Sequence, residues 1–99
     1  MKYSNKKLSI ENIKVQSIAK KFGTPAYCYS YNQLKENINN FKRSFKSFSP
    51  LICFAIKSNT NVNLISEIRK LGLGADVVSM GELMKALKAG IKPNKIVFS

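Results

Sequence analysis

The sequence predicts an α/β fold class whose second half forms the start of a parallel sheet or barrel. From residue 51 onward, short apolar segments alternate with segments of helical periodicity, in the order strand, helix, strand, helix, strand. A glycine closes each predicted helix before the next apolar segment begins. Two consecutive strand–helix units that lead into a third strand are typical of parallel α/β proteins.

The first half is predicted to hold two helices around one strand. Four apolar residues mark the first helix at i, i+3, i+4 and i+7: Val15, Ile18, Ala19 and Phe22. Gly23 ends this helix, and the aromatic-rich residues 25–30 predict a strand. Ser30 and Gln33 have the capping-box spacing that opens a second helix. The apolar stripe of that helix is Leu34, Ile38, Phe41 and Phe45.

The second half is predicted to alternate strictly between strands and helices. Strands are expected at 51–56, 74–78 and 95–98. Thr60 or Asn61 caps the helix between the first two strands, and its buried face is Leu64, Ile65, Ile68 and Leu71. The last helix is expected to run through Leu83, Met84 and Leu87.

Composition limits the possible functions. The 99 residues are 44% hydrophobic, which is ordinary for a globular chain, and no apolar run approaches the ~20 residues of a membrane span. No secretory signal is visible, and Cys28 and Cys53 lie in apolar segments, so we expect buried free thiols and a cytoplasmic location. No metal site is predicted.

The net charge of +12 would suit a nucleic-acid-binding domain. However, Arg43 and Arg69 are the only arginines, the residue type best suited to phosphate recognition, and the lysines are scattered through every segment. We therefore favour a basic, solvated surface, and we expect neither nucleic acid nor membrane as a partner. A basic nucleic-acid-binding domain stays as a remote alternative.

The candidate functional residue with the clearest local signal is Lys57. The apolar run Leu51–Ile56 predicts a strand buried on both faces, and Lys57 stands where that strand stops. Burial disfavours the charged form of a lysine, and a neutral amine is the form that condenses with an aldehyde cofactor. The alternative is a solvated lysine at a strand end.

Side-chain alternation extends this site to the next strand. It places Lys57 on one face with the small residues Cys53 and Ala55, which leave room for a flat ring. If the two strands are adjacent and parallel, Asp76 points into the same interior, where its charge would favour a charged amine at position 57. The alternative is that Asp76 belongs to a loop after Gly74.

Three ordered blocks resemble a known family. FGTPAYCYS at 22–30, FAIKSNTN at 54–61 and GLGADVVSMGEL at 72–83 are similar to the N-terminal part of the pyridoxal-phosphate decarboxylases of the alanine-racemase-like barrel type. The resemblance covers roughly residues 15–98. It implies the opening portion of a pyridoxal-phosphate-binding (β/α)8 TIM barrel. The ADVVS segment favours the branch that acts on diaminopimelate over the ornithine and arginine branch.

The resemblance implies roles at matched positions. Lys57 matches the lysine that carries pyridoxal phosphate, Asp76 an acidic active-site residue, and Ala55 a small residue beside the cofactor ring. Glu82 matches an acidic position near the cofactor in the ornithine branch, although a capping box with Ser79 explains it equally well.

The resemblance also implies a division of the chain and two departures from the family. Residues 1–30 would be an N-terminal helix and a strand of the C-terminal β domain, and residues 31–99 the first, incomplete βα units of the barrel. Ser58 stands where the family often has alanine, and Met80 where it often has glycine. A complete barrel takes about 250 residues, and this chain has no histidine and no glycine-rich phosphate loop. We expect a truncated piece that decarboxylates nothing by itself.

The activity that the resemblance implies is the conversion of meso-2,6-diaminopimelate to L-lysine and carbon dioxide by a homodimeric full-length enzyme. An ornithine- or arginine-type decarboxylase is one alternative. Another is a relative with the same barrel, such as a racemase or a cofactor-binding regulator.

Overall fold

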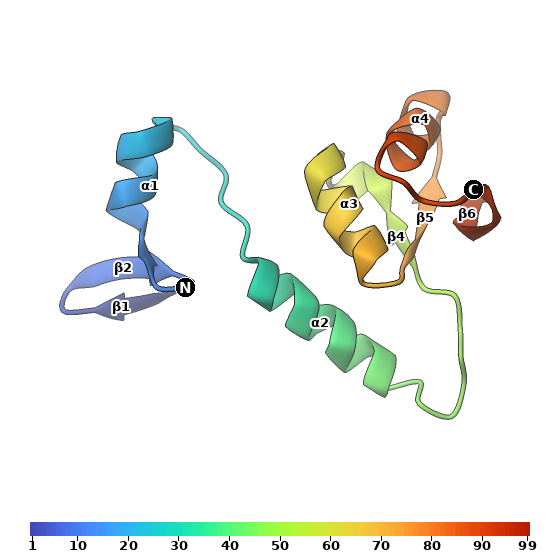
Figure 1. Ribbon diagram of the computed structural model, residues 1–99, viewed down its shortest axis with the longest axis horizontal. Coiled ribbons are helices and arrows are strands. Elements are labelled where there is room, and N and C mark those ends of the chain that lie inside the picture. The colour runs from blue at the N-terminus through green and yellow to red at the C-terminus, as the bar shows by residue number, and fades with distance from the viewer. The chain divides into compact units, whose positions relative to one another are not determined.

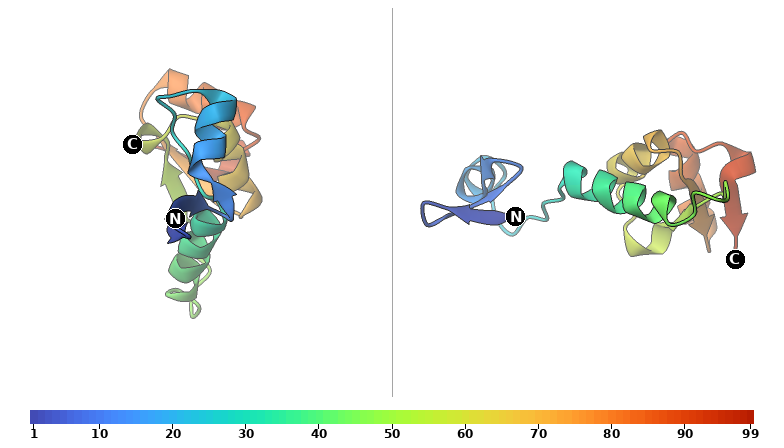
Figure 2. Two further views of the ribbon diagram at one scale, coloured as in Figure 1. Left: turned by 90° about the vertical axis from the view of Figure 1, so that its left-hand side faces the viewer. Right: turned by 90° about the horizontal axis from the view of Figure 1, so that it is seen from below.

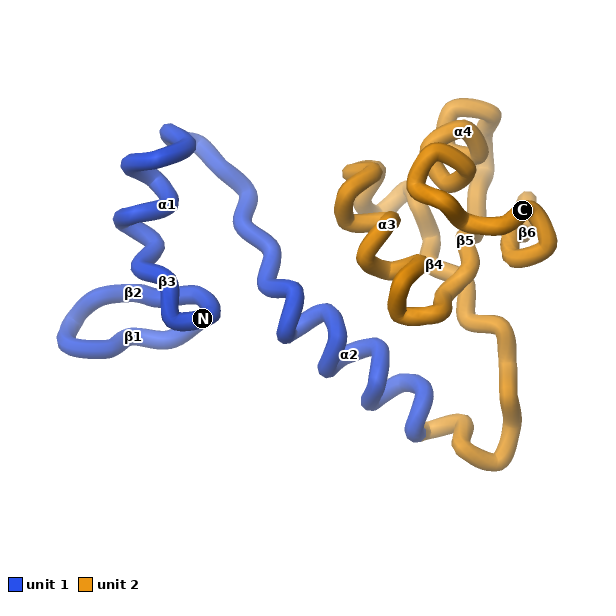
Figure 3. Tube along the Cα trace, viewed as in Figure 1, with its two compact units in different colours: residues 1–43 blue, residues 44–99 orange.

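The computed structural model describes all 99 residues, and the chain divides after Arg43 into two units (Figure 3). The first unit, Met1–Arg43, carries a small antiparallel sheet and two helices. The second unit, Ser44–Ser99, carries a parallel sheet and two helices (Figure 1). None of the helices is both long and apolar enough to cross a bilayer.

The N-terminal sheet was not predicted. It consists of β1 (Lys2–Ser4), β2 (Lys7–Ile10) and β3 (Ile13–Lys14), paired antiparallel in that order. Each connection is a two-residue turn, Asn5–Lys6 and Glu11–Asn12, in which both residues have positive φ. Such turns match the twist of a hairpin and usually contain glycine. Because neither turn contains a glycine, the sequence signal for these hairpins was weak.

Helix α1 (Val15–Phe22) and its end at Gly23, which has φ of 81°, are confirmed. The strand expected at residues 25–30 is wrong for this structure: these residues form an irregular connection between α1 and α2 (Figure 2). They pair with no other strand, and Tyr27 is 92% exposed. A strand is stable only when its backbone groups find partners in a ladder. The assignment of these residues to a C-terminal β domain stays a prediction.

Helix α2 (Tyr31–Arg43) starts as predicted, because Ser30 Oγ accepts a hydrogen bond of 3.1 Å from the Gln33 amide. A second acceptor also serves this terminus. Glu11 Oε1 accepts hydrogen bonds from the Ser30 hydroxyl at 2.9 Å and from the Asn32 amide at 2.6 Å. The predicted apolar stripe is only partly buried: Ile38 is buried, whereas Phe41 is 53% exposed.

The predicted parallel sheet of the second unit is confirmed. Its strands are β4 (Cys53–Ala55), β5 (Gly74–Val77) and β6 (Ile96–Phe98), in that spatial order. Helix α3 (Val62–Lys70) connects β4 to β5, and helix α4 (Met80–Lys88) connects β5 to β6. Short 3₁₀ turns, Ile56–Ser58 and Pro93–Lys95, follow β4 and precede β6.

Local capping explains why these two helices begin and end where they do. The Asn61 side chain accepts from the Asn63 and Leu64 amides, which selects Asn61 rather than Thr60 as the N-cap of α3. Gly72 and Gly90, with φ of 93° and 95°, follow the C-caps. At both helix ends the backbone forms the paired hydrogen bonds of a Schellman motif.

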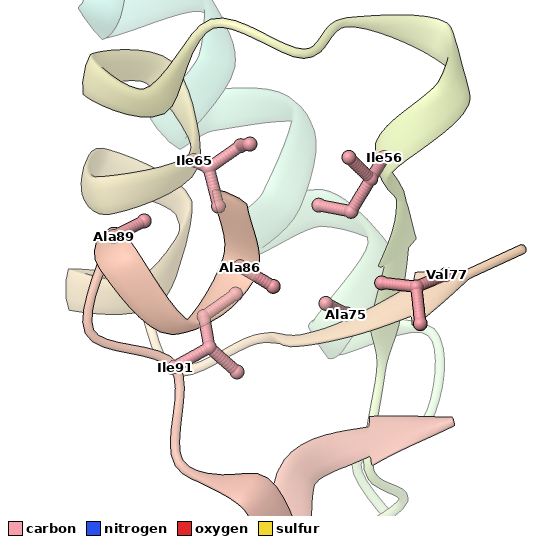
Figure 4. Packing of buried hydrophobic residues seen from close by; sticks show 7 residues of the cluster. All are labelled: Ile56, Ile65, Ala75, Val77, Ala86, Ala89 and Ile91. Atoms are coloured by element: carbon pink, nitrogen blue, oxygen red, sulfur yellow. The ribbon is translucent and has the colours of Figure 1, made fainter. Parts of the chain in front are cut away.

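The core of the second unit lies on one face of the sheet (Figure 4). Both helices contribute to it together with β5 and the turn after β4: Ile56, Ile65, Ala75, Val77, Ala86, Ala89 and Ile91. Helix α4 runs through Leu83, Met84 and Leu87 as predicted, but its closest contact with the sheet is made by another residue. Met84 is 59% exposed, whereas Ala86 is fully buried, because the small residue lets the helix approach the sheet closely.

The strand that precedes Lys57 is shorter and more exposed than predicted. Strand β4 spans Cys53–Ala55 only, its residues are half-buried, and Leu51 is 49% exposed. Burial on both faces was therefore wrong for this structure. The reason is that β4 is an edge strand here, paired with β5 alone.

Substitution of Gly74 tests the close approach of β5 to the segment before β6. A Cβ at this position would overlap the carbonyl oxygen of Lys95. We expect Gly74→Ala to destabilise the full-length protein by about 1–3 kcal/mol, as overpacking does. Thermal unfolding measures this. The control is Gly81→Ala, where the nearest atom lies 3.9 Å from the new Cβ and alanine favours the helix. Equal melting temperatures for the two variants would contradict the packing argument.

Substitution of Glu11 tests the additional cap of α2. Glu11→Gln removes a negative charge from the helix N-terminus, which is expected to cost about 0.3–1 kcal/mol. Amide exchange at Asn32 should then accelerate about twofold to fivefold. Glu36→Gln makes the same chemical change on the exposed side of α2 and should leave exchange at Asn32 unchanged. Equal exchange in both variants would show that the Glu11 carboxylate does not cap the helix.

Candidate functional site

Lys57 lies in a 3₁₀ turn whose backbone is held on both sides. Ile56 before it is fully buried in the core. Ser58 after it donates its hydroxyl to the Ala55 carbonyl at 2.5 Å, and the Asn59 amide donates to the Ile56 carbonyl at 3.0 Å. Ser58, the departure from the family's alanine, therefore closes the turn that presents the lysine.

The Lys57 side chain itself is exposed, so the expectation of an enclosed, desolvated amine is wrong for this structure. The strict alternation used to place Lys57 on one face with Ala55 also fails, because the strand ends at Ala55 and the chain turns. What the structure provides is an accessible amine at the carboxyl end of β4.

Asp76 lies within β5 and not in a loop, which settles the alternative that the sequence left open. Its neighbours Ala75 and Val77 are fully buried in the core under the helices. Since side chains alternate along a strand, the half-buried Asp76 lies on the opposite face of the sheet. The unit has no helix over that face, which we call the open face.

The structure brings Ala55 and Asp76 together. The two strands are parallel neighbours, as predicted, and Ala55 pairs directly with Asp76 in the ladder. The small Ala55 side chain leaves space beside the carboxylate, and Lys57 follows two residues later at the same end of the sheet. Lys57 forms no ion pair with Asp76. The carboxylate instead accepts a hydrogen bond of 2.8 Å from the Ser99 hydroxyl.

Glu82 lies in the first turn of α4 and acts as a helix cap. Its amide donates to Ser79 Oγ at 3.2 Å, and its Oε1 accepts from the Val78 amide at 3.2 Å. This is close to the capping-box role that the sequence offered as an equal explanation, except that the carboxylate bonds the amide of Val78, one residue before the N-cap Ser79. A role for Glu82 beside a cofactor stays a prediction.

Two residues on or near the open face were not predicted as site residues. Cys53 pairs with Gly74 in the ladder, on the same face as Ala55 and Asp76. Its burial, and secondarily the charge of Asp76, raise the pKa of the Cys53 thiol above its usual value. Alternation along β4 was a sufficient signal for its position. Ser99 had no local signal, because its contact to Asp76 joins a residue just after β6 to a residue of β5 that is distant in sequence.

These residues fit pyridoxal phosphate in part. An aldehyde needs an accessible amine, which Lys57 supplies, and a flat ring needs small neighbours, which Ala55 supplies. Asp76 supplies a fixed negative charge at the same end of the sheet. The cofactor's phosphate has no matching glycine-rich loop among these residues.

Comparison with known proteins agrees with this arrangement. The family model described as "Pyridoxal-dependent decarboxylase, pyridoxal binding domain" matches residues 31–99. A diaminopimelate decarboxylase of Helicobacter pylori is 50% identical over 78 residues, which cover 79% of this chain and 19% of that protein. One of Aquifex aeolicus is 42% identical over 99 residues, which cover 100% of this chain and 23% of that protein.

Comparison of the fold with solved structures leads to the same family. The crystal structure of diaminopimelate decarboxylase from M. jannaschii superposes with a TM-score of 0.94 at 35% identity, covering 99% of this chain and 24% of that one. The chain therefore belongs to the pyridoxal-dependent decarboxylase family, and it corresponds to the N-terminal part of the barrel that binds pyridoxal. It spans about a fifth to a quarter of the length of these relatives. The predicted fold class and cofactor are confirmed at the level of the family.

The two cysteines should differ in reactivity. Both are free, but Cys28 is exposed, contrary to the expectation of burial, whereas Cys53 is half-buried with a raised pKa. A raised pKa lowers the thiolate fraction at any given pH, and the thiolate is the reactive form. At pH 7–8, iodoacetamide should therefore modify Cys28 faster than Cys53, as measured by peptide mass spectrometry. Faster labelling of Cys53 would contradict its surroundings in this structure.

Proposed function

We propose that the protein carrying these residues is a carboxy-lyase that uses pyridoxal phosphate to convert meso-2,6-diaminopimelate to L-lysine and carbon dioxide. The observation that carries the proposal is the match of residues 31–99 to the pyridoxal-binding domain of the decarboxylase family. Within the family, the relatives with 50% and 42% identity are diaminopimelate decarboxylases, which favours this substrate over ornithine or arginine.

Lys57 is the residue that would hold the cofactor. Its amine is accessible, and its backbone is held between the buried Ile56 and the closed turn at Ser58. When bound, pyridoxal phosphate supplies an electron sink for the charge left on the substrate carbon as carbon dioxide departs. Lys57 would also be able to hold or deliver a proton at its Nζ atom.

Asp76 and Ala55 would complete this part of the site. The Asp76 carboxylate provides a fixed negative charge on the open face, where it attracts the positively charged groups of a bound ligand. Ala55, directly opposite, keeps the space beside the carboxylate free for a ring. The relatives are about four times as long as this chain, so the phosphate site and the substrate-binding groups would come from other parts of the full-length protein.

The location and the oligomeric state of the full-length enzyme follow from the same proposal. A biosynthetic amino-acid decarboxylase works on a small metabolite, so a cytoplasmic location suits it. We also propose a homodimer of the full-length protein, in accordance with the family resemblance. Neither nucleic acid nor a membrane is part of the proposed function.

Replacement of Lys57 tests the proposal. In full-length protein treated with pyridoxal phosphate and borohydride, peptide mass spectrometry should find the reduced cofactor on Lys57. Lys57→Ala should abolish this label and lower the release of carbon dioxide from meso-diaminopimelate on the order of a thousand-fold or more. Lys88→Ala, which removes an exposed lysine of α4, should change neither.

Two results would reject the proposal. Cofactor attached to other lysines but not to Lys57 would reject the assignment of the residue. Release of carbon dioxide from ornithine or arginine, with none from diaminopimelate, would reject the substrate while leaving the cofactor chemistry in place.

A further inference from the structure

Ser99 lies at the end of the parallel sheet, where both its backbone and its side chain form hydrogen bonds to β5. It follows β6 directly, and its amide donates to the Val77 carbonyl at 3.1 Å, so its backbone continues the ladder with β5. Its hydroxyl reaches back to the open face and donates to Asp76 Oδ1 at 2.8 Å. A residue held through its backbone is a well-placed anchor for a neighbouring side chain.

We propose that Ser99 is the positioning residue for Asp76, and this inference rests on the proposed function. The Ser99 hydroxyl donates a hydrogen bond to Asp76 Oδ1, whereas Asp76 Oδ2 makes no hydrogen bond within the chain. One oxygen is thus fixed by the protein, and the other is free to contact a positively charged group of the cofactor or substrate.

The other groups around Asp76 cannot take over this role. The Cys53 thiol lies on the same face, but it donates to the Lys95 carbonyl, at 3.9 Å, instead of to Asp76. The residues paired with Asp76 on either side, Ala55 and Val97, have no polar side-chain atoms. Loss of the Ser99 hydroxyl would therefore leave the carboxylate free to rotate, and misplacement of a charge by about 1 Å lowers a reaction rate substantially.

The test uses the full-length protein with pyridoxal phosphate bound. Ser99→Ala should lower kcat/KM about tenfold to a hundredfold and shift the pH at which the cofactor's visible absorption changes. Ser99→Thr keeps the hydroxyl and should restore most of the activity and the wild-type pH profile. Ser17→Ala, which removes an exposed hydroxyl of α1, should leave both unchanged.

A double-mutant cycle with Asp76→Asn separates positioning from a general structural effect. If Ser99 acts through Asp76, Ser99→Ala should have little further effect in the Asp76→Asn background. Should Ser99→Ala fail to fold, Ser99→Cys, which has nearly the same shape and a weak donor, is expected to show the same loss. Wild-type kcat/KM and pH profile in a folded Ser99→Ala or Ser99→Cys variant would overturn the proposal. In that case an active wild-type enzyme labelled on Lys57 would leave the proposed function standing.

Discussion

Side-chain alternation along β5 is the constraint on which the rest of the second unit depends. Ala75 and Val77 point into the core beneath α3 and α4, which forces Asp76 onto the open face. A shift of one residue in this strand would bury the carboxylate and expose the packing residues. The burial of apolar surface therefore fixes the position of the charged group, and the parallel pairing with β4 then places Ala55 opposite it.

The sequence was a good guide wherever the determining interactions were local. The boundaries of α3 and α4 followed from caps at Asn61 and Ser79 and from glycines just beyond the last turns, all within a few residues of the helix ends. The adjacency of β4 and β5 followed from the strand–helix–strand order, because such connections produce parallel neighbours.

Features that depend on partners distant in sequence were not predictable in the same way. Residues 25–30 have the composition of a strand, but a strand also needs a neighbour, and composition does not reveal one. The exposure of Lys57 has the same origin, since enclosure of a side chain depends on segments that pack over it. The contact between Ser99 and Asp76 depends on the register of β5 and β6, which brings together residues 23 positions apart.

The firmly held turn after β4 has a mechanical consequence. With Ile56 embedded in hydrocarbon and Ser58 tied to the preceding carbonyl, the main chain on either side of Lys57 has little freedom. The four-carbon stem of the lysine remains flexible. A group bonded to its terminal nitrogen can swing away and return through torsions of that stem alone, so repeated release and recapture of such a group would require no rearrangement of the scaffold.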